Sequence, residues 1–365
     1  MALSAPAGVA PLSRRSFSLS TPRAATESFL FRTWMQRGPA ACLLYPVSLL
    51  FGALAGIRRA FYRRGWLSSK RVAVPVIVVG NVFIGGTGKT PFVVWLVEAL
   101  HDAGFVPGVI SRGYGTGIAT PQAVSCASLP GQVGDEPVLI ACAAGCPVAV
   151  GSDRAGVAAF LLASHPEVNV VISDDGLQHY GLRRDIEIVL FDARGAGNGW
   201  LLPAGPLREP AGRARDFTVV NGSHMPPGMP SDAWQMLLAP REAEQLADRS
   251  RRCALATLAR VGEEPKPRIL AAAGIGNPAR FFRTLDEAGV VFERMALRDH
   301  HVFAADTFAG VSADLILITE KDAVKCQHIA ALKNDSRIWV LPVSAVIDQK
   351  LADRILEKLR GHPTA

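Results

Sequence analysis

The stretch VIVVGNVFIGGTGKTP, residues 76–91, decides the fold class of this chain. It reads as an apolar strand, a glycine-rich turn and the start of a helix, an arrangement in which backbone N–H groups converge on a phosphate. Lys89 would reach the β- and γ-phosphates, and the Thr90 hydroxyl can hold Mg²⁺. The strict motif has a glycine five residues before Gly88, where this chain has Phe83. A glycine turn that binds no phosphate is the alternative interpretation.

From residue 74 onward, short apolar runs alternate with segments of helix length, the pattern of parallel strands joined by crossover helices. A first series of strands is expected at residues 76–79, 106–110, 148–150, 168–173, 186–191 and 217–220. A turn-rich stretch covers 222–266, and a second series follows at 269–273, 290–296, 315–319 and 338–341, with helices near 278–288 and 349–359. The pattern predicts an α/β fold with a P-loop-containing parallel-sheet lobe and a smaller second α/β lobe.

Two carboxylates follow the apolar run at residues 168–173. Asp174 and Asp175 open the sequence DDGLQH, where the carboxyl end of a buried parallel strand would meet a ligand. Beside a phosphate loop, such carboxylates hold or orient Mg²⁺. Capping of a turn or helix is the alternative role for either side chain.

Other polar residues cluster in turns whose chemistry is less specific. Arg112 in SRGYG could grip an anion or a sugar, or simply lie on the surface. Asp135 in GDEP is a natural N-cap for the helix that follows. In the loop LLPAGPLREP, Arg208 and Glu209 could serve a phosphate and a metal ion, or pair with each other. His300 in DHH could be a catalytic imidazole or a structural residue.

Two further chemistries are not expected. No other His or Cys lies at ligand spacing from the DHH sequence, so we expect no zinc site. The sequence TEKD at residues 319–322 differs from the guanine-reading T-K-x-D of GTPases because its Lys and Asp are adjacent. This order argues against GTP as the nucleotide.

Composition and charge narrow the class of protein. A chain of 365 residues that is 49% hydrophobic and 19% charged can bury one large or two ordinary cores, which excludes disordered and collagen-like chains. Residues 1–75 hold eleven Lys and Arg and one acid, whereas the rest hold 28 basic and 31 acidic residues. We therefore expect no nucleic-acid partner, since the basic excess lies in the N-terminal segment. Six cysteines without a C-x-x-C pair predict no disulfide framework and favour a reducing compartment.

The N-terminal segment contains an uncharged run of eighteen residues, 40–57, followed by Arg58, Arg59, Arg63 and Arg64. A helix of this length spans about 27 Å, close to the ~30 Å hydrocarbon core of a bilayer. Basic residues flank both ends, so the positive-inside rule gives no orientation, and a helix lying on the membrane is favoured. A transmembrane span and a buried helix are the alternatives. Residues 1–26 are rich in Ser, Ala and Arg, which fits a disordered tail, a transit peptide or an early start codon.

The motifs GNVFIGGTGKTP, SRGYG, GDEP, SDDGLQH, LLPAGPLREP, DHH and TEKDAVK occur in this order behind the apolar segment. In this combination the chain resembles the tetraacyldisaccharide 4′-kinases, the lipid A 4′-kinases of Gram-negative bacteria. The resemblance covers about residues 35–345, and its most specific parts are SDDGLQH and LLPAGPLRE. Phosphate loops of that family also lack the first glycine. The resemblance divides the chain into an extension (1–34), a membrane-associated helix (35–71), a P-loop kinase lobe (72–222) and a second α/β lobe (223–365).

The resemblance implies an enzyme at the cytoplasmic face of the bacterial inner membrane, with organelle targeting as a minor alternative. It would transfer the γ-phosphate of ATP to the 4′-hydroxyl of a tetraacyldisaccharide 1-phosphate and form lipid IVA. Its partners would be this lipid and the membrane surface, with no obligate protein partner, and its cofactors would be ATP and Mg²⁺.

The resemblance also implies roles for individual residues. ATP would be bound by Phe83, Ile84, Gly85, Gly86, Thr87, Gly88, Lys89 and Thr90. Mg²⁺ would be held by Thr90, Asp174, Asp175 and Glu209. Asp135 would be the base on the sugar hydroxyl with His300 as its partner, Lys89 and Arg208 would stabilise charge, and Arg112 and Tyr114 would face the lipid substrate.

Two other functions use a similar phosphate loop. A membrane-associated regulatory ATPase would hydrolyse ATP without an acceptor, but such proteins usually carry their anchor at the C-terminus, where the helix expected at residues 351–359 is short. A cytosolic small-molecule kinase or ligase would leave segment 40–66 without a function.

Overall fold

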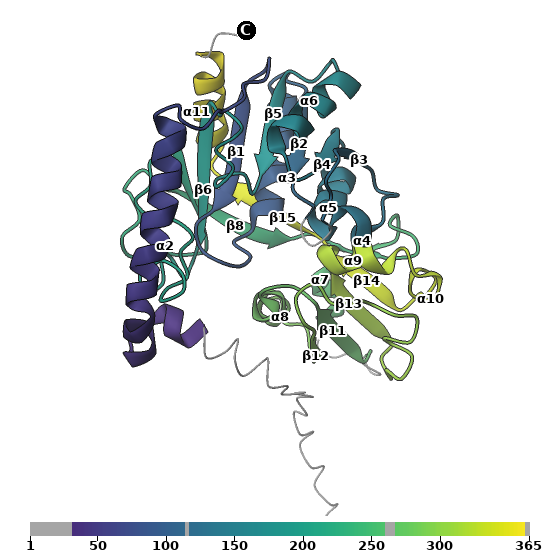
Figure 1. The fold of residues 1–365 in the computed structure, drawn as a ribbon. Helices are drawn as coiled ribbons and strands as arrows, with labels where there is room; N and C mark the ends of the chain where they lie inside the picture. Colours follow the sequence, from purple (N-terminus) through teal and green to yellow (C-terminus); the bar gives the residue numbers. More distant parts are fainter. Residues whose placement is uncertain (1–30, 114–116, 260–266, 362–365) are drawn as a thin grey trace, which may run out of the picture.

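A computed structural model describes residues 31–113, 117–259 and 267–361 of the chain. Two lobes are visible in Figure 1, each built around its own sheet. Within the described residues, the first sheet has nine strands in the order β15-β8-β7-β6-β1-β5-β2-β4-β3, and the second has six in the order β10-β9-β14-β13-β11-β12. The expected α/β fold of two lobes is confirmed.

Strands of the first sheet run parallel from β4 to β8, and β3 and β15 pair antiparallel at its two edges. In chain order they are β1 (Val76–Asn81), β2 (Pro107–Ser111), β3 (Gln122–Val124), β4 (Val148–Val150), β5 (Val170–Asp174), β6 (Ile186–Asp192), β7 (Phe217–Asn221), β8 (Trp234–Pro240) and β15 (Val343–Ile347). Val79 of β1 is in register with Asp174 of β5. The turns after these two strands, which carry the glycine-rich loop and the paired aspartates, therefore open at the same edge of the sheet.

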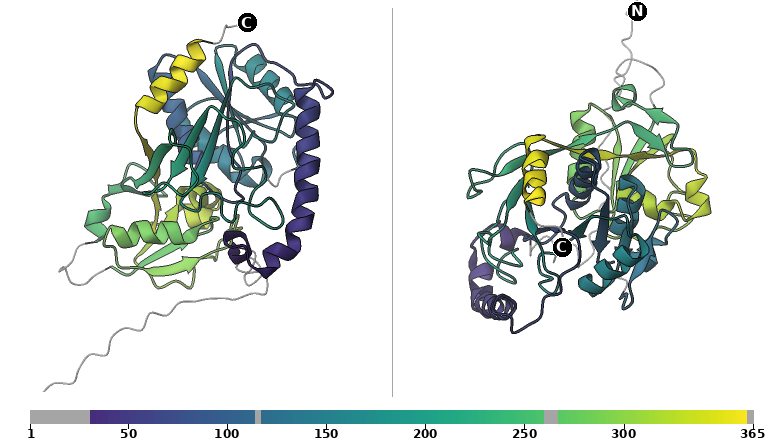
Figure 2. Two further views of the ribbon diagram at one scale, coloured as in Figure 1. Left: turned by 90° about the vertical axis from the view of Figure 1, so that its left-hand side faces the viewer. Right: turned by 90° about the horizontal axis from the view of Figure 1, so that it is seen from above.

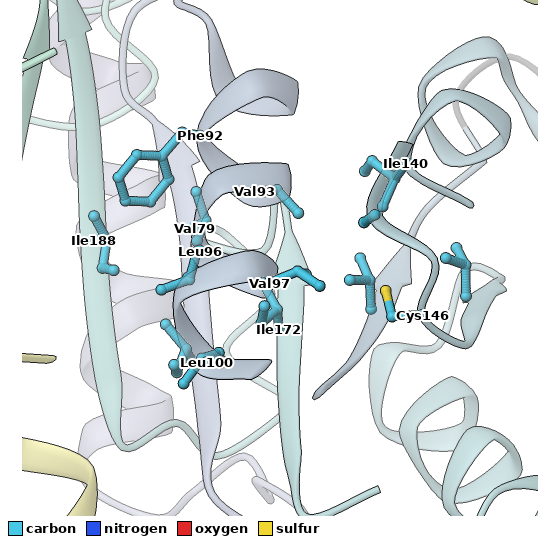
Figure 3. Close-up of a cluster of buried hydrophobic side chains, with 14 of the residues drawn as sticks. Val79, Phe92, Val93, Leu96, Val97, Leu100, Ile140, Cys146, Ile172 and Ile188 are labelled. Atoms are coloured by element: carbon cyan, nitrogen blue, oxygen red, sulfur yellow. The ribbon is translucent and has the colours of Figure 1, made fainter. Parts of the chain in front are cut away.

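The central strand β1 is buried on both faces, as expected for a parallel sheet covered by helices. Ile77 and Val79 point into one core and Val76 and Val78 into the other. Helices α3 (Lys89–Asp102), α5 (Asp135–Ala144), which follows α4 (Pro130–Val133), and α11 (Lys350–Arg360) cover the first face, and α6 (Arg154–Ser164) covers the second. Figure 3 shows apolar side chains of α3 against the sheet; α3 begins at Lys89, directly after the glycine-rich loop.

The second lobe packs a smaller sheet between short helices. Its strands are β9 (Ala243–Gln245), β10 (Arg252–Cys253), β11 (Ile269–Ala273), β12 (Glu293–Ala296), β13 (Leu315–Thr319) and β14 (Ile338–Leu341), and its helices are α7 (Leu255–Leu258), α8 (Pro278–Glu287), α9 (Glu320–Cys326) and α10 (Ala330–Lys333). Strands β11 to β14 pair in parallel, and β9 and β10 pair antiparallel. The strand expected at residues 290–296 is shorter than predicted.

The boundary expected between residues 222 and 223 does not separate the two sheets. The stretch expected to be turn-rich contains β8, which pairs with β7, and β15 pairs with β8. The chain then returns to the first lobe, because Leu351, Ile355 and Leu359 of α11 pack into its core. Figure 2 shows α11, in yellow, against the first lobe. The second lobe is thus an insertion between β8 and β15.

Helix α2 (Pro39–Arg63) lies along the side of the first lobe (Figures 1 and 2). Ser48 donates a hydrogen bond of 2.8 Å to the carbonyl oxygen of Leu201 and accepts one of 2.9 Å from the amide of Ala204. A Cβ atom on Gly52 would stand 2.8 Å from a methyl carbon of Leu201, so glycine permits this close approach. One narrow stripe of α2 therefore contacts the loop at residues 201–204.

The structure pairs Cys126 with Cys142 as a disulfide, with Cα atoms 5.0 Å apart. No disulfide framework was expected, because six cysteines are few for this length and show no C-x-x-C pair; the two residues that pair are 16 positions apart. The other four cysteines form no disulfide: Cys42, Cys146, Cys253 and Cys326.

Candidate active site

The glycine-rich loop joins β1 to α3 in the geometry that a phosphate loop requires. Gly88 is the N-cap of α3, and its φ of 90° is a left-handed conformation that suits glycine. A Cβ atom there would lie 2.2 Å from the Nδ2 atom of Asn221. Asn81 holds the loop from below, since its Nδ2 atom donates to the carbonyl oxygens of Phe83 and Gly85 at 2.7 and 2.9 Å. No side chain caps α3, so the amides of its first turn point at the position of an anion.

Two of the expected nucleotide-binding residues make structural contacts beside the glycine-rich loop. The Phe83 ring is buried in the core, and the Ile84 amide donates to the carbonyl oxygen of Pro206 at 3.0 Å. Both residues tie the loop to the segment that carries Arg208. Their expected part in ATP binding stays a prediction.

Lys89 lies between Asn81 and Asp175. Its Nζ atom is 3.5 Å from an Asp175 carboxylate oxygen and donates to the Asn81 side chain at 3.3 Å. Arg208 contacts the same carboxylate at 3.2 Å. Although burial alone would raise the pKa of Asp175, Lys89 and Arg208 lower it below the usual value. Asp175 is thus an anion at neutral pH that holds two cations at the mouth of the phosphate loop.

Asp174 differs from its neighbour because it is buried at the end of β5. One carboxylate oxygen accepts a 3.3 Å hydrogen bond from the Ser111 hydroxyl, and the other has no hydrogen-bond partner among the described residues. Burial raises the pKa of Asp174 to about 7, and Glu136 at the start of α5 acts in the same direction. A buried oxygen without a partner fits a cation ligand that is completed when Mg²⁺ enters with a nucleotide.

Glu209 does not join the two aspartates, contrary to the expected magnesium site of three carboxylates. Its oxygens accept from Gln178 at 3.1 Å and from the Tyr180 hydroxyl at 2.9 Å, and Arg213 lies 3.3 Å away. In the described part of the chain, no group of three or more His, Cys, Asp or Glu residues could hold a metal ion. Mg²⁺ in kinases takes one or two carboxylates plus phosphate oxygens and water, so Thr90 and Asp174 are a sufficient protein contribution.

Asp135 contacts the second lobe. It is the first residue of α5, and the N-cap is Gly134, so the expected N-cap role is not observed. Instead, the Oδ2 atom of Asp135 lies 3.0 Å from the Nδ1 atom of His300. His300 has a positive φ of 55°, and Lys325 lies 4.0 Å from the same Asp135 oxygen. The two lobes therefore meet through a carboxylate and an imidazole.

The remaining expected substrate residues follow β2. Arg112 is exposed, within electrostatic range of Arg154 and His179, and Tyr114 lies outside the described residues. Burial lowers the pKa of His179 to about 4, and the Arg154 and Arg112 guanidinium groups act in the same direction. His179 is therefore neutral at pH 7, beside a positively charged stretch of the site.

Two arginines at the phosphate loop are absent from the sequence-based site. Arg194, after β6, forms a bidentate pair with Asp192, donates to the carbonyl oxygen of Gly86 at 3.2 Å and lies 4.2 Å from the centre of the Phe83 ring. Arg280, on α8, donates to Asn221, whose amide in turn donates to the Thr87 carbonyl oxygen at 2.9 Å. The available signal for Arg194 was its place after a parallel strand next to β1.

The parallel sheet, the glycine loop with its lysine and the adjacent carboxylates define a P-loop phosphotransferase. A family model for tetraacyldisaccharide-1-phosphate 4′-kinase matches residues 40–360. The chain belongs to this family, as its motifs indicated.

Individual relatives agree with this membership. The tetraacyldisaccharide 4′-kinase of Janthinobacterium sp. (strain Marseille) is 60% identical over 347 residues, which cover 95% of this chain and 100% of the relative. The enzyme of the same name from Herminiimonas arsenicoxydans is 56% identical over 355 residues, covering 95% and 99%. A crystal structure of LpxK from Aquifex aeolicus in complex with ATP superposes with a TM-score of 0.71 at 26% identity, over 87% of this chain and 99% of that one.

Proposed function

We propose that this chain, as a tetraacyldisaccharide 4′-kinase, transfers the γ-phosphate of ATP to the 4′-hydroxyl of a tetraacyldisaccharide 1-phosphate and forms lipid IVA. The observation that carries the proposal is the Asp135–His300 pair, which joins the second lobe to α5 of the lobe that carries the phosphate loop. The second lobe also reaches this loop directly, since a Cβ atom on Gly276 would stand 3.7 Å from the Gly86 amide nitrogen. A nucleotide and an acceptor hydroxyl can therefore be enclosed between the lobes.

The phosphate loop and its cations bind and neutralise ATP. The amides of residues 85–90 donate hydrogen bonds to the phosphate oxygens, and Lys89 and Arg208, which Asp175 holds in place, stabilise the charge that develops on the transferred group. Thr90 and Asp174 would hold Mg²⁺, with Asp175 near the reacting phosphoryl group. When bound, the ion neutralises phosphate charge and fixes the orientation of the triphosphate.

Asp135 acts as the general base in this assignment. Its carboxylate accepts the proton of the 4′-hydroxyl as the sugar oxygen bonds to the γ-phosphorus, and the bond from that phosphorus to the leaving ADP oxygen breaks. His300, at 3.0 Å, orients the carboxylate and can take up the proton. In this proposal, Arg112 and Tyr114 face the lipid substrate.

The lipid acceptor requires an enzyme at the membrane surface, because its acyl chains leave a bilayer at a cost of about 0.8 kcal/mol per CH₂ group. By length and composition, α2 is the one helix in the described ranges that could cross a membrane. Only 11% of its most apolar 18-residue stretch is buried. Its exposed apolar residues include Leu43, Leu50 and Leu54, which are 82%, 62% and 59% exposed.

Contacts along the whole of α2 support a helix that lies on the membrane instead of spanning it. Arg37, just before the helix, donates to the Asn198 carbonyl oxygen at 3.0 Å. Near its end, Arg59 lies 3.9 Å from Glu209, and the Tyr62 and Tyr180 rings are 5.8 Å apart. A span would carry the attached lobe into the hydrocarbon. We place the protein at the cytoplasmic face of the inner membrane, where ATP is available.

Phosphate transfer from labelled ATP to a tetraacyldisaccharide 1-phosphate in mixed micelles with Mg²⁺ tests the proposal. The unmutated protein should yield a doubly phosphorylated lipid, and Lys89→Ala should yield none. Release of ADP without an acceptor, with no labelled lipid, would contradict the proposal and favour a regulatory ATPase.

A further inference from the structure

The junction beside the Asp135–His300 pair contains two lysines from α9. Lys321 and Lys325 are four residues apart and therefore lie on the same side of the helix. The Nζ atom of Lys321 is 3.4 Å from Glu136 of the first lobe and 3.4 Å from Asp299 of the second. Both lysines belong to the TEKDAVK motif, for which the kinase assignment above gives no role.

Lys321 completes a closed ring of contacts. The Oδ1 atom of Asp299 that faces Lys321 also accepts a 3.0 Å hydrogen bond from the His300 amide. His300 then contacts Asp135, which is adjacent to Glu136 in α5, and Glu136 returns to Lys321. Two members come from α5 of the first lobe and three from the second, so the ring forms only when the lobes are together.

Charge explains why a cation is needed at this point. Asp135, Glu136 and Asp299 would place three carboxylates at one junction, where they would repel one another across the lobes. Burial alone would lower the pKa of Lys321, but Glu136, Asp299 and Asp135 raise it above its usual value. The lysine is thus a permanent cation whose side chain is only 16% exposed, a setting in which an ion pair is screened little.

Lys325 has a different position. Its Nζ atom is 2.9 Å from the fully buried Asp322 and donates to the His301 carbonyl oxygen at 3.2 Å. Asp322 also accepts from the Gly274 amide at 2.8 Å and from the Thr319 hydroxyl at 2.7 Å. Lys325 is therefore held mainly within the second lobe and reaches the first lobe only at Asp135, 4.0 Å away, whereas Lys321 lies 3.4 Å from a carboxylate of each lobe.

We propose that Lys321 is a positioning residue for the transfer reaction: by joining Glu136 to Asp299 it holds His300 against Asp135 when the lobes close. The inference rests on the proposed function, since it gives Lys321 a role only through Asp135. Lys321 itself touches no reacting atom.

The test is steady-state phosphate transfer with a charge exchange across the lobes. Lys321→Met should lower kcat about tenfold with an unchanged KM for ATP, because binding at the phosphate loop does not involve the ring. Lys321→Arg should retain most of the activity. Lys321→Glu should be worse than Lys321→Met, and the double variant Lys321→Glu with Glu136→Lys should recover at least about threefold in kcat over Lys321→Glu alone.

The matched control is Lys333→Glu, at an exposed lysine of α10 in the same lobe, which should behave as the unmutated protein. If Lys321→Met does not fold, Asp299→Asn breaks the same ring at a side chain that is 43% exposed and should give the same loss of kcat. The inference is overturned if these ring variants keep the unmutated kcat, or if the double variant is no better than Lys321→Glu. Failure of the unmutated protein to transfer phosphate would instead contradict the proposed function.

Discussion

The Oδ2 atom of Asp135 lies 3.0 Å from the Nδ1 atom of His300, although 165 positions of sequence separate the two residues. Asp135 comes from the start of α5 and His300 from the loop after β12. The pair exists only because the two lobes are in contact. Its geometry fits a carboxylate that is oriented by an imidazole to accept a proton.

Replacement of this carboxylate should separate chemistry from binding. We expect Asp135→Ala to lower phosphate transfer by at least about 100-fold, the usual contribution of a general base. ATP affinity, measured by equilibrium titration, should be unchanged because the phosphate loop remains intact. Asp232→Ala, at an exposed aspartate of the first lobe, is the control. Turnover that persists in Asp135→Ala would show that another group is the base.

Asp174 should make folding stability depend on pH. Its pKa in the folded state is about 7, above the unfolded value, so the folded protein holds this proton more tightly and loses stability as pH rises from about 4 to 7. The Asp174→Asn variant should not show this loss of stability, because asparagine does not titrate. The stability of the unmutated protein relative to the variant should fall by roughly 1–4 kcal/mol over that interval, as measured by urea unfolding without Mg²⁺.

Two neighbours of Asp174 do not obscure that comparison. Burial lowers the pKa of Arg154 only to about 10, so it stays charged throughout. Burial lowers the pKa of His179 to about 4, and its titration occurs in both proteins and cancels. A difference in stability that is constant from pH 4 to 7 would refute the raised pKa.

The exposed side of α2 should determine membrane binding. Leu50→Glu places a charge on a leucine that is 62% exposed, so folding should be unaffected while partition onto anionic vesicles falls by about 10- to 100-fold. Val291→Glu, at a 78% exposed valine of the second lobe, is the matched control. Vesicle flotation measures both. Equal binding of Leu50→Glu and the control would exclude α2 as the membrane contact.

Arg194 should support nucleotide binding by fixing the phosphate loop. Arg194→Ala removes the hydrogen bond to the Gly86 carbonyl oxygen and the contact with the Phe83 ring. We expect the Kd for ATP to rise about tenfold, the effect of one lost hydrogen bond in the upper part of the usual range. The control is Arg268→Ala, an exposed arginine that also pairs with an aspartate, Asp314. An unchanged Kd would mean that the loop holds its shape without Arg194.

The sequence alone was sufficient to predict the strands that are buried on both faces. Continuous apolar runs such as residues 76–79 and 315–319 lie within the observed strands β1 and β13, because hydrophobic patterning and burial coincide there. Strand β8 was missed because it mixes buried and exposed residues and follows several prolines. Its partner β15 lies about a hundred residues later, so no local pattern could show that both belong to the first lobe.

The motifs predicted which residues form the site more completely than they predicted how the side chains are arranged. Lys89, Asp174 and Asp175 lie together as expected, since they follow neighbouring parallel strands. The sequence does not predict the direction of a side chain. Glu209 accepts a hydrogen bond from Tyr180 and does not join the two aspartates. The environment of Arg194 likewise depends on tertiary contacts with the loop at Gly86.

The two connections between the lobes run next to each other. Val343 of β15 is in register with Pro240 of β8, and the Arg241 amide donates to the Pro342 carbonyl oxygen at 2.9 Å. As in any antiparallel pair, each of these two strands is held by backbone hydrogen bonds to the other. The insertion therefore joins the first lobe at one place, through two adjacent strands, and not at two separate points. His300 is thereby carried by a part of the chain whose one attachment to the lobe of Asp135 is this pair of strands.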